Sequence, residues 1–214
     1  MQRFFMGAAC AAIALSTFTS ASASSWFQTS AYVAADLGRS DANFSRSDFG
    51  AFQATDSGGN TYVFTPSVDD KDVALAFLVG IQPHPNIALD VGYLDLGEAS
   101  VTYQAAGTGV SAKGEIGVDG MTLGINLLSP SYRQVTLFAR GGLFRWSSDT
   151  RVRIDGATLA SDDDDGTDPF YGVGLLFGWD NLRFRAGVTR YEVEDTDIDV
   201  YGGGLQYRFP VGGA

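Results

Sequence analysis

The chain offers very few residues for acid–base or nucleophilic chemistry. Its only histidine, His84, lies in the short run Pro83–Asn86 between two apolar segments. Proteolysis or deacylation needs a nucleophile with a base beside it, or a carboxylate paired with a histidine. A lone histidine in a tight turn is most often a solvated turn residue, and the sequence contains no acyltransferase motif. We therefore predict a non-enzymatic protein without catalytic residues or cofactors.

Four consecutive aspartates, Asp162–Asp165, are the one candidate for metal binding. With Gly166 at the sixth position of a calcium-binding loop, the twelfth position is Gly172 instead of the required glutamate. A run of like charges is more often a solvated, extended loop. We therefore predict no metal site. Divalent cations near lipopolysaccharide phosphates are retained only as a candidate partner of the acidic loops.

Other charges lie inside otherwise apolar segments, on the face that is occupied mainly by Gly, Ala and Thr. These residues are Asp36, Asp90, Arg140, Arg183, Arg185 and Arg208. If that face points into a narrow interior, the charges must pair, because an isolated buried ion costs several kcal/mol. We expect an Arg–carboxylate network that fills the interior, stabilises the fold and gates any conductance.

Eight segments of the chain would position these charges. In the clearest, Tyr171–Trp179, large apolar side chains at odd positions alternate with glycines and Leu176 at even positions. Successive side chains of a strand point to opposite faces, so this period of two indicates a β-strand. The same alternation recurs in segments that begin near Ala31, Asp72, Ile87, Met121, Val135, Leu182 and Tyr201.

The links between these segments alternate between long and short. The short links are residues 83–86, 129–134 and 180–181, and the long links are residues 41–71, 97–112 and 147–168. Short turns at one end and long loops at the other are typical of an outer-membrane barrel. An even number of strands closes the sheet without an edge in lipid. The pattern predicts an all-β fold, an eight-stranded antiparallel up-and-down transmembrane β-barrel.

Residues 1–23 have the pattern of an export signal. Arg3 precedes the apolar run Phe4–Leu15, and the small residues at 21–23 form a cleavage site that ends at Ala23. Cys10 is the only cysteine, so the mature chain would have no disulfide. We predict a signal peptide over residues 1–23, a barrel domain over residues 24–214, and localisation in the cell outer membrane after cleavage near Ala23.

Charge and composition restrict both the class of β-barrel and the kinds of partner that the chain could bind. The formal net charge of −11 excludes nucleic acid. Lys71 and Lys113 are the only lysines, whereas the polar face of a soluble lipocalin-like barrel should be rich in Lys and Glu. Aromatic residues on the face that is predicted to point outward lie near both ends of the predicted strands, as in membrane girdles. They are Trp179, Tyr207 and Phe209 on the turn side, and Tyr93, Tyr171 and Tyr201 on the loop side.

The C-terminal part of the chain resembles the OmpA-like transmembrane-domain family of small outer-membrane β-barrels. The matching runs are DGTDPFYGVG at 165–174, DNLRFR at 180–185, RYEV at 190–193 and GGGLQYRF at 202–209. In that family the last strand is read by the barrel-assembly machinery, which would here contact Tyr201, Leu205, Tyr207 and Phe209. Two features depart from the family: five residues follow Phe209, and a peptidoglycan-binding domain is absent.

The resemblance implies a structural or surface-interaction role, with outer-membrane lipid and lipopolysaccharide as surroundings and a monomer as the expected state. A narrow porin-like diffusion channel is one alternative, although eight strands leave little room inside beyond side chains. A soluble lipocalin-like ligand carrier is the other. It would pack Phe77, Leu123, Leu175 and Leu205 into a central cavity.

Overall fold

Ten antiparallel strands make up the part of the chain that the computed structural model describes, which is residues 30–43, 50–55, 58–59, 61–105, 111–154, 157–179, 181–194 and 196–210. The strands are β1 (Ser30–Ala42), β2 (Phe52–Thr55), β3 (Thr61–Asp69), β4 (Lys71–His84), β5 (Ile87–Ala105), β6 (Ser111–Leu128), β7 (Val135–Ile154), β8 (Ala157–Trp179), β9 (Leu182–Val193) and β10 (Thr196–Pro210). Within these residues, no helix is long and apolar enough to cross a membrane. The predicted signal peptide, residues 1–23, lies outside the described residues.

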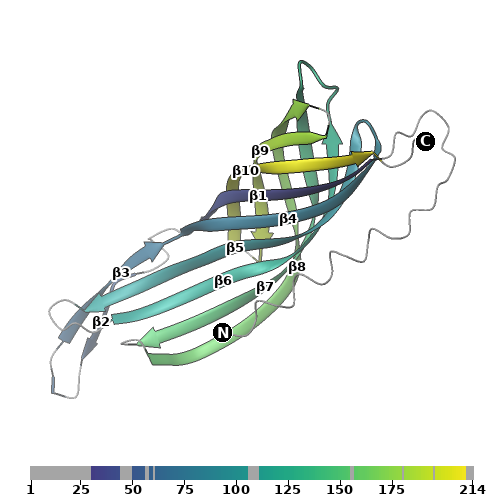
Figure 1. Cartoon of the computed structure of the whole chain (residues 1–214). Helices are drawn as coiled ribbons and strands as arrows, with labels where there is room; N and C mark the ends of the chain where they lie inside the picture. Colours follow the sequence, from purple (N-terminus) through teal and green to yellow (C-terminus); the bar gives the residue numbers. More distant parts are fainter. Residues whose placement is uncertain are drawn as a thin grey trace.

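Eight of the strands close into a barrel. β1 pairs with β4 on one side and with β10 on the other, and each remaining neighbour along the chain from β4 to β10 pairs in turn (Figure 1). The predicted eight-stranded antiparallel barrel is confirmed. β2 and β3 are additional short strands within the link that was expected to be a loop, and β3 pairs with β5.

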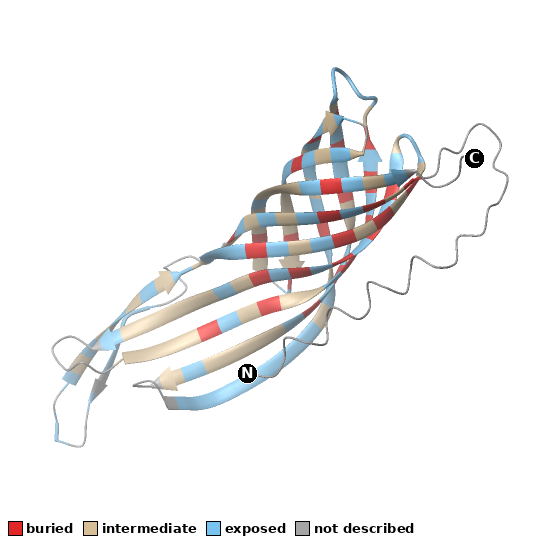
Figure 2. Cartoon of the chain, in the orientation of Figure 1, coloured by how far each residue is buried: buried red, intermediate tan, exposed pale blue. Residues whose placement is uncertain are grey.

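The apolar face of the barrel points outward. Phe77, Leu123, Leu175 and Leu205 are 53, 59, 40 and 47% exposed. Figure 2 shows the resulting alternation, with buried and exposed residues following one another along each barrel strand. A soluble ligand carrier would bury these side chains together in its cavity. The lipocalin-like alternative is therefore wrong.

On one side of the barrel the wall continues as an open, curved sheet (Figure 1). The pairing of β8 with β9 ends at Phe170 and Tyr191, whereas its pairing with β7 continues to Ala157. We call this part the sheet extension. It comprises β2, β3 and residues 98–105, 111–118, 147–154 and 157–169. The expectation of loops over 97–112 and 147–168 is thus wrong for most of these residues. Outside the membrane neither face needs to be apolar, so the alternation that reveals a strand disappears.

A β-bulge marks the point where the sheet extension leaves the barrel. The register of β5 shifts between Asp95 and Glu98, and Gly97 there has a φ of +79°, a conformation that favours glycine. The backbone N–H of Glu98 donates to Asp72 Oδ2 at 2.8 Å. Beyond the bulge, from Ser100 onward, β5 pairs with β3 instead of β4. Bulges bend strands in this way at barrel rims.

The four aspartates are exposed, as predicted, but they lie along a sheet edge instead of at a loop tip. Asp162–Asp165 pair with residues 150–147 of β7, and their other side has no strand partner in the described residues. Consecutive side chains of a strand point to opposite faces, so these carboxylates cannot converge on one ion. Charged residues on an open edge instead oppose pairing with a second sheet.

Candidate functional site: the filled barrel interior

The inward side chains of β7 give the order of the layers inside the barrel. From the turn end they are Thr136, Phe138, Arg140, Phe144 and Trp146, all buried. Thr136 borders a cavity, Phe138 belongs to an apolar cluster, and Arg140 belongs to a polar layer. Phe144 and Trp146 belong to a second, larger apolar cluster. The lumen therefore alternates between polar and apolar layers along its axis.

Asp90 is the centre of the polar layer. Its Oδ2 accepts hydrogen bonds from the Tyr32 hydroxyl at 2.9 Å and from Asn126 Nδ2 at 2.6 Å. Arg140 Nη2 lies 3.6 Å from Oδ1, beyond hydrogen-bond distance, so this contact acts through charge. The Arg140 and Asp90 side chains are 5 and 0% exposed, so each is the compensating charge for the other.

A second ion pair lies in the same layer. Arg185 Nε is 3.2 Å from Asp36 Oδ2, and Arg185 Nη1 donates to Gln206 Oε1 at 3.1 Å. The guanidinium also stacks over the Phe138 ring, 5.3 Å from its centroid. Cation–π contacts of this kind strengthen when water is excluded. The two arginines and two aspartates of this layer balance in charge.

Glycines make room for these contacts between strands that are not direct neighbours. Gly80 of β4 lies in register between Tyr32 of β1 and Asp90 of β5, and the Tyr32 ring occupies the space a side chain would need there. Gly204 of β10 lies in register between Asp36 and Arg185 in the same way. The inward glycines are therefore part of the site, because each lets a polar side chain pass over the intervening strand.

Of the six charges predicted to form one network, the structure brings four together. Arg183 and Arg208 lie elsewhere, where they line a cavity at the turn end of the barrel. The sequence showed that all six share the inward face, but it did not show their levels along the axis.

The aromatic side chains of the larger apolar cluster were missed by the sequence reasoning. Phe144 and Phe170 are 0 and 1% exposed, and both rings contact Tyr191 at centroid distances of 5.3 Å. Trp146 Nε1 donates to Asp168 Oδ2 at 2.7 Å. All four aromatics have inward parity once the strands are extended by a few residues. Continuing the inward–outward alternation beyond the predicted strand ends is the signal that could have found them.

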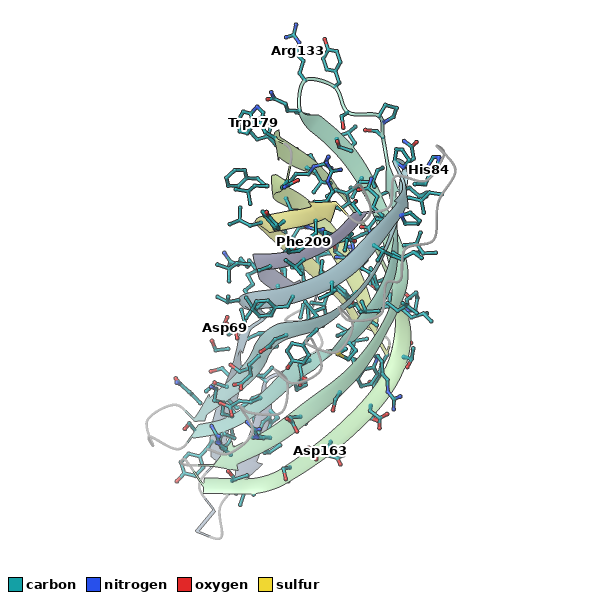
Figure 3. The ribbon with its side chains drawn as sticks, turned by 45° about the vertical axis from the view of Figure 1, so that its right-hand side comes forward. Asp69, His84, Arg133, Asp163, Trp179 and Phe209 are labelled. Carbon is teal, nitrogen blue, oxygen red and sulfur yellow. The ribbon has the colours of Figure 1, made fainter. Side chains whose placement is uncertain are left out.

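His84 has no catalytic environment. It is exposed at the end of β4, next to the turn, and its Nδ1 accepts a hydrogen bond from the backbone N–H of Asn86 at 3.1 Å. Figure 3 shows it at the turn end of the barrel with Arg133, far from Asp163 in the sheet extension.

Across the described residues, no group of three or more His, Cys, Asp and Glu side chains is placed to hold a metal ion.

In the sheet extension, a small charged cluster joins β6 to β7. Glu115, with 7% of its side chain exposed, lies 2.7 Å from Lys113 Nζ and 2.8 Å from Arg153 Nη1. The hydrogen bond from Lys113 lowers the pKa of the Glu115 carboxyl, and the charges of Lys113, Arg153 and Arg151 lower it further, while burial opposes them. This carboxylate therefore stays ionised at a lower pH than an unperturbed glutamate does.

Comparison with known proteins agrees with the geometry. The family described as outer membrane protein beta-barrel domain matches residues 10–209. This chain belongs to that family. It is an outer-membrane β-barrel protein, a class in which the short turns face the periplasm. No protein with curated annotation matches the sequence.

Solved structures of small outer-membrane barrels resemble this chain. OprG from Pseudomonas aeruginosa has a TM-score of 0.51 and 11% identity, covering 86% of this chain and 98% of OprG. The N-terminal β-barrel domain of OprF from the same organism has a TM-score of 0.48 and 12% identity, covering 86 and 99%. The attachment invasion locus protein Ail of Yersinia pestis has a TM-score of 0.46 and 12% identity, covering 86 and 99%. At these identities, the likeness to OprG shows the fold alone.

The outward face of β10 carries the residues predicted as the assembly signal of this barrel. Tyr201, Leu205, Tyr207 and Phe209 are all exposed there, as lipid-facing residues should be. The rings of Tyr207 and Phe209 meet edge to face at 4.7 Å. Recognition of this strand by the barrel-assembly machinery stays a prediction.

Proposed function

We propose that this outer-membrane protein is non-enzymatic and has a structural or surface-interaction role, which it performs through the sheet extension. The observation that carries the proposal is the filled lumen. Because the barrel is closed along its axis, the sheet extension is the part of the protein that is available for interactions. The Arg–Asp layer and the aromatic cluster lie one above the other inside eight strands.

The spaces beside the polar layer are small. A cavity of about 50 Å³ borders Asp36, Arg140 and Arg185, and one of about 10 Å³ borders Tyr32 and Asn126. Spaces of this size hold a few water molecules and no solute of metabolic size. A narrow diffusion channel, the alternative function, would have to displace buried ion pairs to conduct.

The sheet extension offers a large surface beyond the membrane. On one of its faces the Phe52 and Phe64 rings stack at 4.8 Å, and Tyr103 lies 5.3 Å from Phe52. Phe52 is 46% exposed. Aromatic side chains on a rigid sheet are good anchors for a partner, since they supply contact area at a low cost in conformational entropy.

Shortening one hairpin tests this role. Thr150 of β7 and Asp162 of β8 are partners in register, so residues 151–161 can be replaced by an Asn-Gly turn. We expect a barrel that still migrates as a folded, heat-modifiable protein, with loss of adhesion to immobilised extracellular-matrix proteins and glycans, or of resistance to SDS and EDTA. Arg133→Ala, at the opposite end, should change neither property.

Conductance in planar bilayers separates the structural role from a channel. The wild-type protein should give no discrete conductance steps at ordinary voltages. Regular steps that persist in the shortened variant would instead favour the diffusion channel. A shortened variant that folds and keeps every surface and envelope property of the wild type would contradict a role of the β7–β8 hairpin in the sheet extension.

A further inference from the structure

A cavity opens at the periplasmic end of the barrel, below the layers that fill the lumen. Its volume is about 250 Å³, far above the roughly 10–15 Å³ that one water molecule requires. Arg183 of β9 and Arg208 of β10 line it, together with residues of the two short turns at 83–86 and 129–134. The cavity is distinct from the spaces in the polar layer.

The cavity is closed toward the membrane centre. Leu128 lines it and also belongs to the apolar cluster that contains Tyr32, Phe138 and Leu176. This cluster separates the cavity from the Arg–Asp layer above it. A ligand would therefore enter from the short-turn end, and the apolar cluster would oppose its passage through the barrel.

The lining of the cavity is cationic and rich in hydrogen-bond donors. Two of its side chains are arginines, and the neutral polar ones are Ser30, Gln82, Asn86, Ser129, Ser131 and Thr136. None of the lining residues, all of which lie in the described part of the chain, is acidic. Arg183 and Arg208 lie close enough for their like charges to act on one another.

One hydroxyl pair illustrates the available donors. Ser131 Oγ and Thr136 Oγ1 are 2.7 Å apart, and Thr136 is 5% exposed. Only one of their two hydroxyl hydrogens is used in the mutual bond, so the other can be donated to a ligand. Guanidinium groups add planar pairs of N–H donors, whose spacing matches two oxygens of a phosphate.

We propose that this cavity is a binding site for a phosphate-type oxyanion that enters from the periplasmic side, held by Arg183 and Arg208. Free phosphate and the phosphate of an anionic lipid headgroup have the same recognition chemistry. The site rests on the geometry of the barrel end and is independent of the role of the sheet extension.

Calorimetric titration of the full mature chain, folded in zwitterionic detergent without phosphate and at constant ionic strength, tests the proposal. One arm uses inorganic phosphate and the other uses glycerol phosphate. Saturable binding of either supports the site, and tighter binding of glycerol phosphate identifies the headgroup as the source. We expect Arg183→Gln and Arg208→Gln each to weaken binding by about tenfold, which corresponds to one charge-assisted hydrogen bond.

Arg133→Gln is the matched control, because Arg133 is exposed on a turn at the same end and does not line the cavity. Its dissociation constant should remain within twofold of wild type. If the glutamine variants fail to show heat-modifiable folding, Arg183→Lys and Arg208→Lys replace them, with weaker binding still expected from the loss of the paired donors. The proposal is overturned by wild-type protein without saturable binding, or by an equal loss of binding in Arg133→Gln.

Discussion

Arg185 reaches Asp36 across the strand that separates them, with Nε and Oδ2 3.2 Å apart, by passing over Gly204. A side chain at position 204 would overlap the Asp36 carboxylate and the carbonyl oxygen of Ala35. The ion pair thus connects β1 to β9 inside the barrel, in addition to the hydrogen bonds that run through β10. Contacts of this type make the filling of the lumen and the closure of the barrel interdependent.

Removing one member of a buried pair should be costly. Arg140→Ala leaves the fully buried Asp90 carboxylate without its compensating charge, and we expect a loss of about 3–5 kcal/mol in the free energy of unfolding. Urea unfolding in lipid vesicles, followed by heat-modifiable migration, measures it. Arg133→Ala, on an exposed turn, should stay within about 0.5 kcal/mol of wild type. Equal stability of the two variants would refute the role assigned to the pair.

Replacing both partners should be less harmful than replacing one. In Arg140→Met combined with Asp90→Asn, no uncompensated charge remains, and the asparagine can still interact with Tyr32 and Asn126. We expect the double variant to be more stable than Arg140→Ala in the same unfolding experiment. A double variant that loses as much as the sum of its single variants would show that the two charges are not coupled.

The glycine beneath the second ion pair should tolerate no side chain. Gly204→Ala places a methyl group against backbone and carboxylate atoms, and we expect a loss of about 1–3 kcal/mol in the same unfolding assay. Gly114→Ala is the control, since a Cβ there would meet no atom within 4 Å. It should be neutral or slightly stabilising. If both substitutions behave alike, the close approach over position 204 is unimportant.

The stability of the sheet extension should depend on pH through Glu115. Its hydrogen bond from Lys113 lowers its folded-state pKa below the value in the unfolded chain. The carboxylate therefore stabilises the pairing of β6 with β7 above the unfolded pKa of roughly 4.3, and this contribution is lost as pH falls through the lowered pKa. Amide hydrogen exchange of residues 111–118, corrected for intrinsic rates, should report local opening in acid.

Glu115→Gln provides the comparison for that experiment. The variant lacks the charge at every pH, so its amides should exchange faster than wild type at neutral pH and should show little further change on acidification. Barrel amides, such as those of Leu123 and Ile125, should be unaffected. The same pH dependence in wild type and variant would assign the acid sensitivity to other groups.

The aspartates on the edge of β8 should keep the protein monomeric. Replacing Asp162–Asp165 by asparagine removes the charge while keeping side-chain size, and leaves an open edge that can pair with a second copy. We expect self-association that increases with concentration, measured by light scattering after size-exclusion chromatography. Asp69→Asn together with Asp70→Asn, at another site, controls for half of this loss of net charge. A strictly monomeric edge variant would contradict this role.

The sequence could predict the barrel because lipid imposes a simple rule on each strand. In Tyr171–Trp179 and Tyr201–Phe209, apolar residues must recur at every second position, so the strand, its outward face and the inward parity of Arg185 can all be read locally. The short turns follow from the same pattern. Where the membrane ends, this requirement ends too, and the strands of the sheet extension could not be distinguished from loops.

By itself, then, the sequence determined the closed barrel, its orientation toward lipid and which residues face inward. Only the tertiary structure decided which inward residues meet, because contact between Tyr32 and Asp90, or between Arg185 and Asp36, depends on the register of three strands at once. The same register carries Arg183 and Arg208 away from those aspartates to the periplasmic cavity. The face on which a residue lies is a local property of its strand, whereas its position along the barrel axis is set by the pairing of the whole sheet.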